Sequence, residues 1–225
     1  MINYIQYREA VNMEKIRIDF VSDVVCPWCA IGYKRLTQAI AETGLQDKVD
    51  IVWHPFFLNP DMPQEGENNN DYGARKYNRS LEESRLNRER ITAMAKDNGL
   101  TFNLDDNTRV INTYKAHVAL EYARQLGKQT ALKERLFTAF FTEKKDISKT
   151  EALEQEMRTV GLELNDSADV FNNQDIQNYI EAEVSKWQAV GISSVPTMFF
   201  NQKLRVNGSQ TIEGYKQILT EAMAH

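Results

Sequence analysis

The chain has 225 residues, of which 42% are hydrophobic and 26% are charged, a composition typical of a globular protein that buries a core without a disulfide staple. Its net charge of −5 disfavours a nucleic-acid or anionic-membrane partner, since either would require a basic face. No stretch approaches the roughly 18 consecutive apolar residues of a membrane span, and the first residues lack the apolar block of a secretory signal, so we expect a cytoplasmic location.

The first part of the fold is expected to be a strand–helix–strand unit that follows an N-terminal extension, residues 1–14. Residues 15–21 alternate between apolar and polar types, which indicates a strand. A helix is expected from the cysteine pair at Cys26 and Cys29 to Ile40, with Gly44 as its stop. Residues 49–53 form a second strand, and the helical crossover makes the two strands parallel.

The middle of the chain is expected to be helical. It begins with a loop, residues 59–70, rich in Pro, Asn, Asp and Gly, and continues with a heavily charged helix over residues 74–97. The thin apolar stripe of that helix comprises Leu81, Ile91 and Met94. Further segments with helical spacing of apolar residues are 109–126, 132–141, 153–160 and 176–187.

The end of the chain returns to strands. Residues 197–200 and 203–206 flank Asn201 and Gln202 as a hairpin, and a last helix follows. The order β-α-β, helical block, β-β-α predicts an α/β fold with a small mixed sheet and a large all-helical insertion. The expected domains are a sheet domain, residues 15–58 and 188–225, and an insertion domain, residues 59–187.

The cysteine motif carries the clearest chemical signal. Pro27 suits the first position of a helix, which makes Cys26 the cap residue, with its sulfur near free N–H groups and the positive end of the helix dipole. Both effects favour the thiolate, so we predict a low pKa for Cys26, a nucleophilic role for it, and a resolving role for Cys29 one turn further in. Asp23 opposes this effect by its negative charge.

Two simpler interpretations of the pair are buried structural thiols and a zinc-ligand pair. Two cysteines cannot form a four-ligand zinc site alone, and the other usual ligands are sparse: His54, His117 and His225. Two cysteines separated by two residues after a strand instead favour redox chemistry, so no metal is expected.

A second signal is Val195-Pro196, directly before a predicted strand. A proline there is compatible with simple entry into an edge strand. The functional interpretation is a cis peptide bond beside the cysteines, with the backbone of Val195 free to pair with a substrate chain. Only about 5% of X–Pro bonds are cis, so the sequence pattern alone does not decide between the two.

Four ordered segments, residues 23–29, 56–63, 112–117 and 191–197, resemble the DsbA-like thioredoxin superfamily, specifically its FrnE-like branch. The resemblance extends from Lys15 to the end of the chain. It implies a thioredoxin fold with a helical insertion, a nucleophilic Cys26, a resolving Cys29 and a cis Pro196 beside them. The dipeptide Pro27-Trp28 departs from the Pro-His of the periplasmic oxidases, so their strongly oxidising character does not transfer.

Several other residues are weaker candidates. Pro27, Trp28, Val195 and Pro196 are expected to contact the substrate. Asp19, on the first strand, is a candidate proton acceptor for Cys29 or a solvated strand residue. His117 lies on an apolar helix face, and the simpler interpretation is a core residue with satisfied hydrogen bonds. The alternative is a role near the active site, which its position in the family supports.

The sequence therefore predicts a thiol–disulfide oxidoreductase that uses no cofactor beyond its own dithiol. Its partners would be protein or small-molecule thiols and disulfides, with glutathione as a candidate co-substrate; the oligomeric state stays open. One alternative is a glutathione-dependent isomerase or transferase, which keeps a single catalytic serine or cysteine. Another is a non-enzymatic metal- or redox-sensing module.

Overall fold

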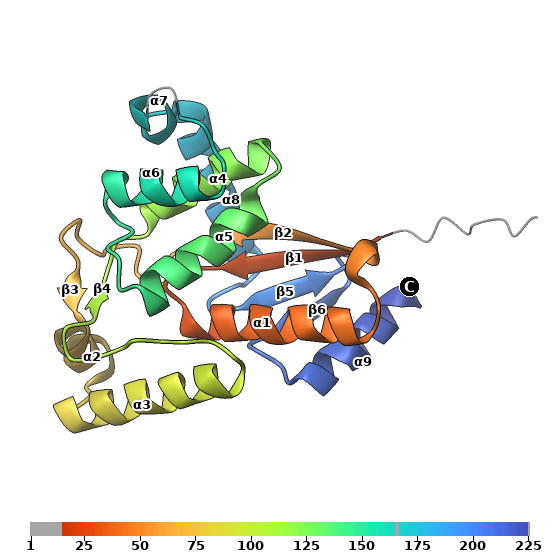
Figure 1. Ribbon diagram of the computed structural model, residues 1–225, viewed down its shortest axis with the longest axis horizontal. Coiled ribbons are helices and arrows are strands. Elements are labelled where there is room, and N and C mark those ends of the chain that lie inside the picture. Colours follow the sequence, from red (N-terminus) through yellow and green to blue (C-terminus); the bar gives the residue numbers. More distant parts are fainter. Residues whose placement is uncertain (1–14, 165–166, 225) are drawn as a thin grey trace, which may run out of the picture.

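The computed structural model describes residues 15–164 and 167–224. Its centre is a four-stranded sheet of order β2-β1-β5-β6 (Figure 1). The strands are β1 (Ile16–Ser22), β2 (Val49–Pro55), β5 (Thr197–Phe200) and β6 (Leu204–Asn207). Strand β1 is parallel to β2 and antiparallel to β5, which pairs antiparallel with β6. The two ends of the chain thus form one mixed sheet, and the predicted fold class is confirmed.

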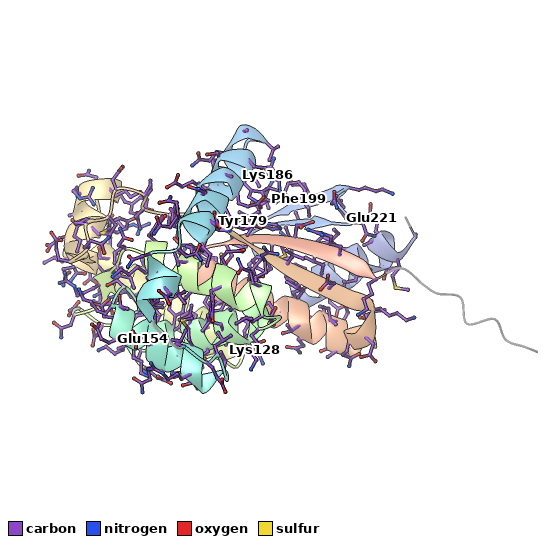
Figure 2. All side chains as sticks on the ribbon, turned by 90° about the horizontal axis from the view of Figure 1, so that it is seen from above. Lys128, Glu154, Tyr179, Lys186, Phe199 and Glu221 are labelled. Atoms are coloured by element: carbon purple, nitrogen blue, oxygen red, sulfur yellow. The ribbon has the colours of Figure 1, made fainter. Side chains whose placement is uncertain are left out.

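Helices cover both faces of this sheet, because successive side chains of a strand point to opposite sides. Ile18 and Phe20 are buried in a core with α1 (Pro27–Glu42) and α9 (Ile212–Met223). On the other side, Val21 packs with Trp187 of α8 (Gln174–Ala189). Figure 1 shows α1 in front of the sheet and α8 behind it, and Figure 2 shows α8 along that second face.

Two predicted turns are confirmed. Helix α1 ends at Glu42, and Gly44 follows with φ of +68°, in the left-handed region that favours glycine. The β5–β6 hairpin turns at Asn201 and Gln202, which have φ of 50° and 58°. Positive φ at both central residues matches the right-handed twist of the flanking strands, and asparagine tolerates it best after glycine.

The expected helices after the charged segment form a second core. Apolar side chains that include Val118, Leu132, Leu136 and Leu153 are fully buried in it. The elements are α4 (Tyr114–Gln125), α5 (Gln129–Phe137), a short π-helical segment (Thr138–Thr142), α6 (Thr150–Thr159), α7 (Ser167–Phe171) and α8. No helix in residues 15–164 or 167–224 is both long and apolar enough to cross a membrane.

The prediction of one charged helix over residues 74–97 is wrong. The structure has two helices there, α2 (Asn69–Tyr77) and α3 (Leu81–Asp97). Asn78 ends α2 with φ of 52°, and Ser80 and Glu83 form a reciprocal capping box that starts α3. Leu81, expected in the apolar stripe, is 71% exposed because it lies in the first turn beyond the packed face.

The insertion also contains strands, so it is not all-helical. Strand β3 (Glu67–Asn68) pairs antiparallel with β4 (Arg109–Val110). This short ladder ties the loop before α2 to the segment after α3, and both lie beside these helices in Figure 1. The domain boundaries near residues 58 and 187 stay predictions, and the extension of residues 1–14 lies outside the described residues.

Candidate functional site

The dithiol lies where β1 leads into α1. Pro27 is the first residue of α1 and Cys26 is its cap residue, as predicted. The side chain of Cys26 forms no capping hydrogen bond; its Sγ lies 3.6 Å from the backbone carbonyl oxygen of Val195. Cys29 follows one turn later, and its backbone N–H donates to the carbonyl of Cys26. Both cysteines are free thiols, and both are buried.

The segment before β5 lies directly against the cysteines. The Val195–Pro196 peptide bond is cis, as the resemblance implied. The carbonyl oxygen of Val195 accepts a hydrogen bond from Cys26 Sγ, so this backbone group is within reach of any chain that reacts at Cys26. Pro196 is buried behind Val195, and its own carbonyl accepts from the backbone N–H of Gly208.

The two sulfurs share a proton, and this overturns the prediction of a low pKa at Cys26. The hydrogen bond with Cys29, followed by burial, raises the pKa of Cys26 well above that of a free thiol. Burial alone would raise the pKa of Cys29. Hydrogen bonds with Cys26 and Ser22 and the charge of Lys133 outweigh burial, so the pKa of Cys29 is below its usual value. The pair therefore loses one proton readily and the second with difficulty. The negative charge of Asp23 adds to the rise at Cys26, as expected.

Access, rather than pKa, distinguishes the two thiols. A cavity of about 310 Å³ opens against Cys26, and its lining includes Pro27, Trp28 and Val195. Cys29 and Pro196 do not belong to this lining. Three of the four residues predicted to contact substrate thus share one cavity with Cys26, and Cys29 lies behind it.

A buried polar group, which we call the thiol cluster, lies at the turn that carries the cysteines; it comprises Asp23, His117 and Lys133. His117 Nε2 is 3.4 Å from Asp23 Oδ1, and both atoms lack a hydrogen-bond partner within the described residues. The other oxygen of Asp23 accepts from the backbone N–H of Leu58 at 2.9 Å. His117 also has a backbone hydrogen bond at Phe56 that acts on its pKa, so its two interpretations, a core residue and a role near the active site, both stay predictions.

The titration of this pair follows from burial and neighbouring charge. Burial raises the pKa of Asp23, but the nearby His117, the hydrogen bond from the backbone N–H of Leu58 and the charge of Lys133 together outweigh it, so the pKa of Asp23 is lowered. Burial lowers the pKa of His117, and Lys133 adds to that effect. The structure thus favours an ionised Asp23 and a neutral His117 near neutral pH.

Lys133 is the member of the thiol cluster that the sequence analysis missed. Its side chain is buried, and its Nζ lies 5.2 Å from the ring centroids of both Trp53 and Phe137. Burial lowers the pKa of Lys133 to about 8, against the opposing negative charges of Cys29 and Asp23. The signal in the sequence was its spacing: Lys133 precedes Phe137 by four positions, which places it on the apolar face of α5.

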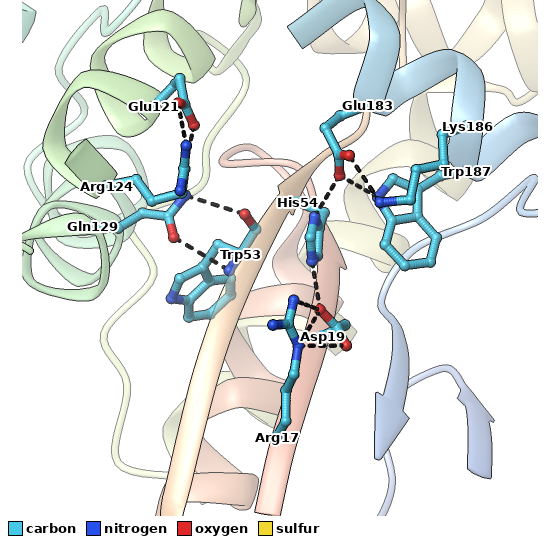
Figure 3. A network of polar contacts seen from close by, with 10 residues as sticks. All are labelled: Arg17, Asp19, Trp53, His54, Glu121, Arg124, Gln129, Glu183, Lys186 and Trp187. Carbon is cyan, nitrogen blue, oxygen red and sulfur yellow. Dashed lines mark hydrogen bonds and ion pairs between the residues drawn. The ribbon is translucent and has the colours of Figure 1, made fainter. Parts of the chain in front are cut away.

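Asp19 does not approach Cys29. It belongs to a second polar group, which we call the sheet cluster: the exposed Arg17 with Asp19, His54 and Glu183 (Figure 3). His54 bridges the two acids, with Nε2 2.8 Å from Asp19 and Nδ1 2.7 Å from Glu183. Asp19 points to the face covered by α8, whereas Cys29 packs with the residues of the other face. The structure supports neither proton transfer with Cys29 nor the solvated alternative, since Asp19 is 3% exposed.

The sequence is similar to known proteins over most of its length. The model of the DSBA-like thioredoxin domain family matches residues 17–220. Uncharacterized protein YwbO of Bacillus subtilis (strain 168) is 25% identical over 185 residues, which cover 81% of this chain and 85% of that protein.

Solved structures share the fold. A probable DsbA oxidoreductase from Streptomyces coelicolor superposes with a TM-score of 0.87 at 24% identity, covering 93% of this chain and 91% of that one. The cytosolic disulfide reductase DsbM from Pseudomonas aeruginosa, solved with GSH, superposes with a TM-score of 0.65 at 16% identity, covering 93% and 100%. Within residues 15–164 and 167–224, no group of three or more His, Cys, Asp or Glu side chains is placed to hold a metal ion.

Proposed function

The chain belongs to the DSBA-like thioredoxin domain family, and on that premise we propose that it is a thiol–disulfide oxidoreductase that works through Cys26 and Cys29. The observation that carries the proposal is the arrangement of the two sulfurs. Cys26 lines an open cavity beside the Val195 carbonyl, and Cys29 contacts it from the buried side. Cys26 is therefore the nucleophile, and Cys29 resolves the mixed disulfide.

The shared proton supplies the nucleophile. Transfer of that proton from Cys26 to Cys29 along the sulfur–sulfur hydrogen bond leaves a thiolate on the accessible sulfur when a disulfide arrives. After Cys26 has reacted, Cys29 loses its proton and attacks the sulfur of Cys26. The positive charge of Lys133 favours the thiolate of Cys29 at this step. The proposal requires no cofactor beyond the dithiol.

The assignment of roles is tested by trapping the mixed disulfide. The reduced Cys29→Ser variant should accumulate a stable adduct on Cys26 when mixed with a small disulfide, measured by mass spectrometry, because the resolving thiol is missing. The Cys26→Ser variant should form no adduct at a comparable rate, because Cys29 is fully buried. An adduct that forms faster on Cys29 would exchange the two roles.

The direction of electron flow is set by the reduction potential of the pair. Equilibration in graded glutathione buffers, with free thiols counted, measures it. A value near about −270 mV would make the protein a reductase, whereas about −180 to −120 mV would make it an oxidase or isomerase. Failure to form a disulfide over this range would overturn the proposal.

The glutathione-dependent alternative has a separate signature. Such an enzyme needs one catalytic thiol, so its activity should survive in Cys29→Ser, whereas repeated disulfide exchange should not. A cytoplasmic location and membership of the FrnE-like branch remain part of the proposal, and the fold shared with a cytosolic reductase is compatible with the former.

A further inference from the structure

The cavity beside Cys26 has a basic wall that the dithiol chemistry does not explain. Among the described residues that line it are Arg79, Arg88, Arg90 and Arg109, and none of the lining residues is Asp or Glu. The whole chain is acidic, with 32 Asp and Glu against 27 Lys and Arg. The wall therefore runs against the overall charge, so average composition does not account for it.

The four arginines differ in their partners. Arg88 is buried and forms an ion pair with Asp106 and a hydrogen bond to Asn70, so its charge is neutralised inside the fold. The hydrogen bonds and ring contacts of the other three involve uncharged groups. Arg79 stacks over a tyrosine ring, Arg90 donates to an asparagine side chain, and Arg109 donates to a backbone carbonyl. Among the described residues, none of these three forms a salt bridge, although Arg79 is close enough to Glu83 to lower the pKa of that carboxyl.

Much of the remaining lining is apolar, and it includes the reacting sulfur. Cys26, Trp28 and Val195 belong to this apolar set, together with Phe140 and Phe141. The cavity volume of about 310 Å³ is at the lower end of the range for small-molecule pockets. A reactive thiol among apolar side chains, in one cavity with guanidinium groups that form no salt bridge, suits a compact ligand whose sulfur is separated from an anionic group.

We propose that this cavity binds a low-molecular-weight disulfide that carries carboxylate groups. Guanidinium groups bind carboxylates through charge-assisted hydrogen bonds, and a cleft lined by one sign of charge raises the local concentration of the opposite ion. Arg79, Arg90 and Arg109 hold the carboxylates, and the apolar side chains present the disulfide to Cys26. This inference rests on the proposed exchange activity and adds its substrate class.

The reaction balances without a further reagent. The thiolate of Cys26 attacks one sulfur of the substrate, which forms the Cys26–substrate disulfide and releases one substrate thiolate. The thiolate of Cys29 then attacks Cys26, forms the Cys26–Cys29 disulfide and releases the second thiolate. The protein loses two electrons and two protons, and the substrate becomes two thiols. The reverse sequence oxidises the same small thiol.

The test is a single turnover of the reduced protein with three disulfides of different charge: dithiodipropionate, which is anionic, bis(hydroxyethyl) disulfide, which is neutral, and cystamine, which is cationic. Each rate is divided by the rate of the same disulfide with dithiothreitol, which removes intrinsic reactivity. The anionic probe should exceed the cationic one by about tenfold or more at low salt. Because Arg90 and Arg109 are exposed and Arg79 is half-buried, salt at about 1 M should largely remove this preference.

Variants locate the preference at the wall. The triple variant Arg79→Gln, Arg90→Gln, Arg109→Gln should lose most of it and keep the rate with the neutral probe. Arg158→Gln is the matched control, because that side chain is 57% exposed on α6 and does not line the cavity.

Two negative results have distinct meanings. Equal normalised rates for the three probes in the unmodified protein, or an unchanged preference in the triple variant, would overturn the inference and leave the exchange activity in place. No reaction with the neutral probe would overturn the proposed function, and this inference with it.

Discussion

Two buried aspartate–histidine pairs at β1 have opposite properties. In the sheet cluster, His54 contacts two acids, Asp19 and Glu183, and all of these contacts have hydrogen-bond geometry (Figure 3). In the thiol cluster, His117 faces one acid, Asp23, at a distance and angle that leave both facing atoms unpartnered. The two aspartates are separated by only four positions along the chain.

The neighbours of each histidine determine its charge. Burial lowers the pKa of His54, but the hydrogen bonds of Asp19 and Glu183 outweigh it, so the pKa of His54 is raised. The pKa of His117 is lowered, because burial dominates and Lys133 is nearby. The sheet cluster is thus a compensated ion network, whereas the thiol cluster keeps a buried cation whose negative neighbours include the cysteines.

This difference indicates separate roles. Buried polar atoms are almost always hydrogen-bonded, so unpartnered ones beside a reactive group mark a functional site. Satisfied contacts in the sheet cluster join β1, β2 and α8 and are structural. In the thiol cluster, by contrast, the charge of Asp23 raises the pKa of Cys26 and the charge of Lys133 lowers that of Cys29, so we expect it to affect the chemistry. Three experiments can break or sharpen this division.

Removal of the bridging histidine should have the largest effect on stability. His54→Leu removes a hydrogen bond from each of two acids, which leaves Asp19 with Arg17 and Glu183 with Lys186 and Trp187. This should cost about 3–5 kcal/mol of the free energy of unfolding in urea. The single-turnover exchange rate of the folded fraction should stay within about twofold, because the sheet cluster lies on the face away from Cys29. A stable variant with slow exchange would contradict the division.

Removal of the buried cation should affect the chemistry instead. Lys133→Met keeps the length of the side chain and deletes the charge that favours the Cys29 thiolate, so exchange at neutral pH should slow by about tenfold. The difference should shrink above pH 8, because the pKa of Lys133 is about 8 and the unmodified protein then loses its own charge. Stability should stay equal or rise, since a charged ammonium is costly to bury and methionine is not.

The control for this variant is Lys34→Met, which removes an exposed lysine of the same helix that carries the cysteines. Rates are measured from the loss of free thiols, and thiolate formation from its ultraviolet absorbance as the pH is raised. Equal pH profiles for Lys133→Met and the unmodified protein would remove Lys133 from the site.

The smallest expected effect is on the pH dependence of stability, which should differ in sign between His54 and His117. Because the folded pKa of His54 is raised, its stabilisation is present below the unfolded value near 6.5 and is lost as the pH rises through the folded value. The folded pKa of His117 is lowered, so its contribution is present above about 6.5 and is lost as the pH falls. Unfolding free energies of His54→Gln and His117→Gln between about pH 5 and 8 should therefore diverge from the unmodified protein in opposite directions, by on the order of 1 kcal/mol.

Acid adds a further expectation for the same measurement. The carboxyls of Asp19 and Glu183 have pKa values of about 2, so their stabilisation is lost as the pH falls from their ordinary range near 4 toward 2. A His54→Gln variant without a reduced acid dependence would show that other contacts hold these acids ionised.

Local sequence patterns determined the framework of this protein. The strand β1, the proline at the start of α1 and the cysteine spacing fixed where the dithiol lies, because each depends on a few neighbouring residues. Glycine and asparagine at turns located the end of α1 and the β5–β6 hairpin. The break between α2 and α3 was missed although Ser80 and Glu83 show the capping-box spacing, since the charged pattern on both sides hid it.

Only the tertiary structure decided the environment of that dithiol. Proton affinity depends on burial and on charges that distant segments bring near, so the low pKa expected for Cys26 from its helix position gave way to a proton shared with Cys29. Asp19 was assigned the wrong neighbours because a strand pattern gives alternation but not which helix covers each face. Lys133 and the arginines of the cavity come from the insertion. Tertiary packing brings them near the cysteines, and the periodicity of a single segment cannot predict which distant segments pack together.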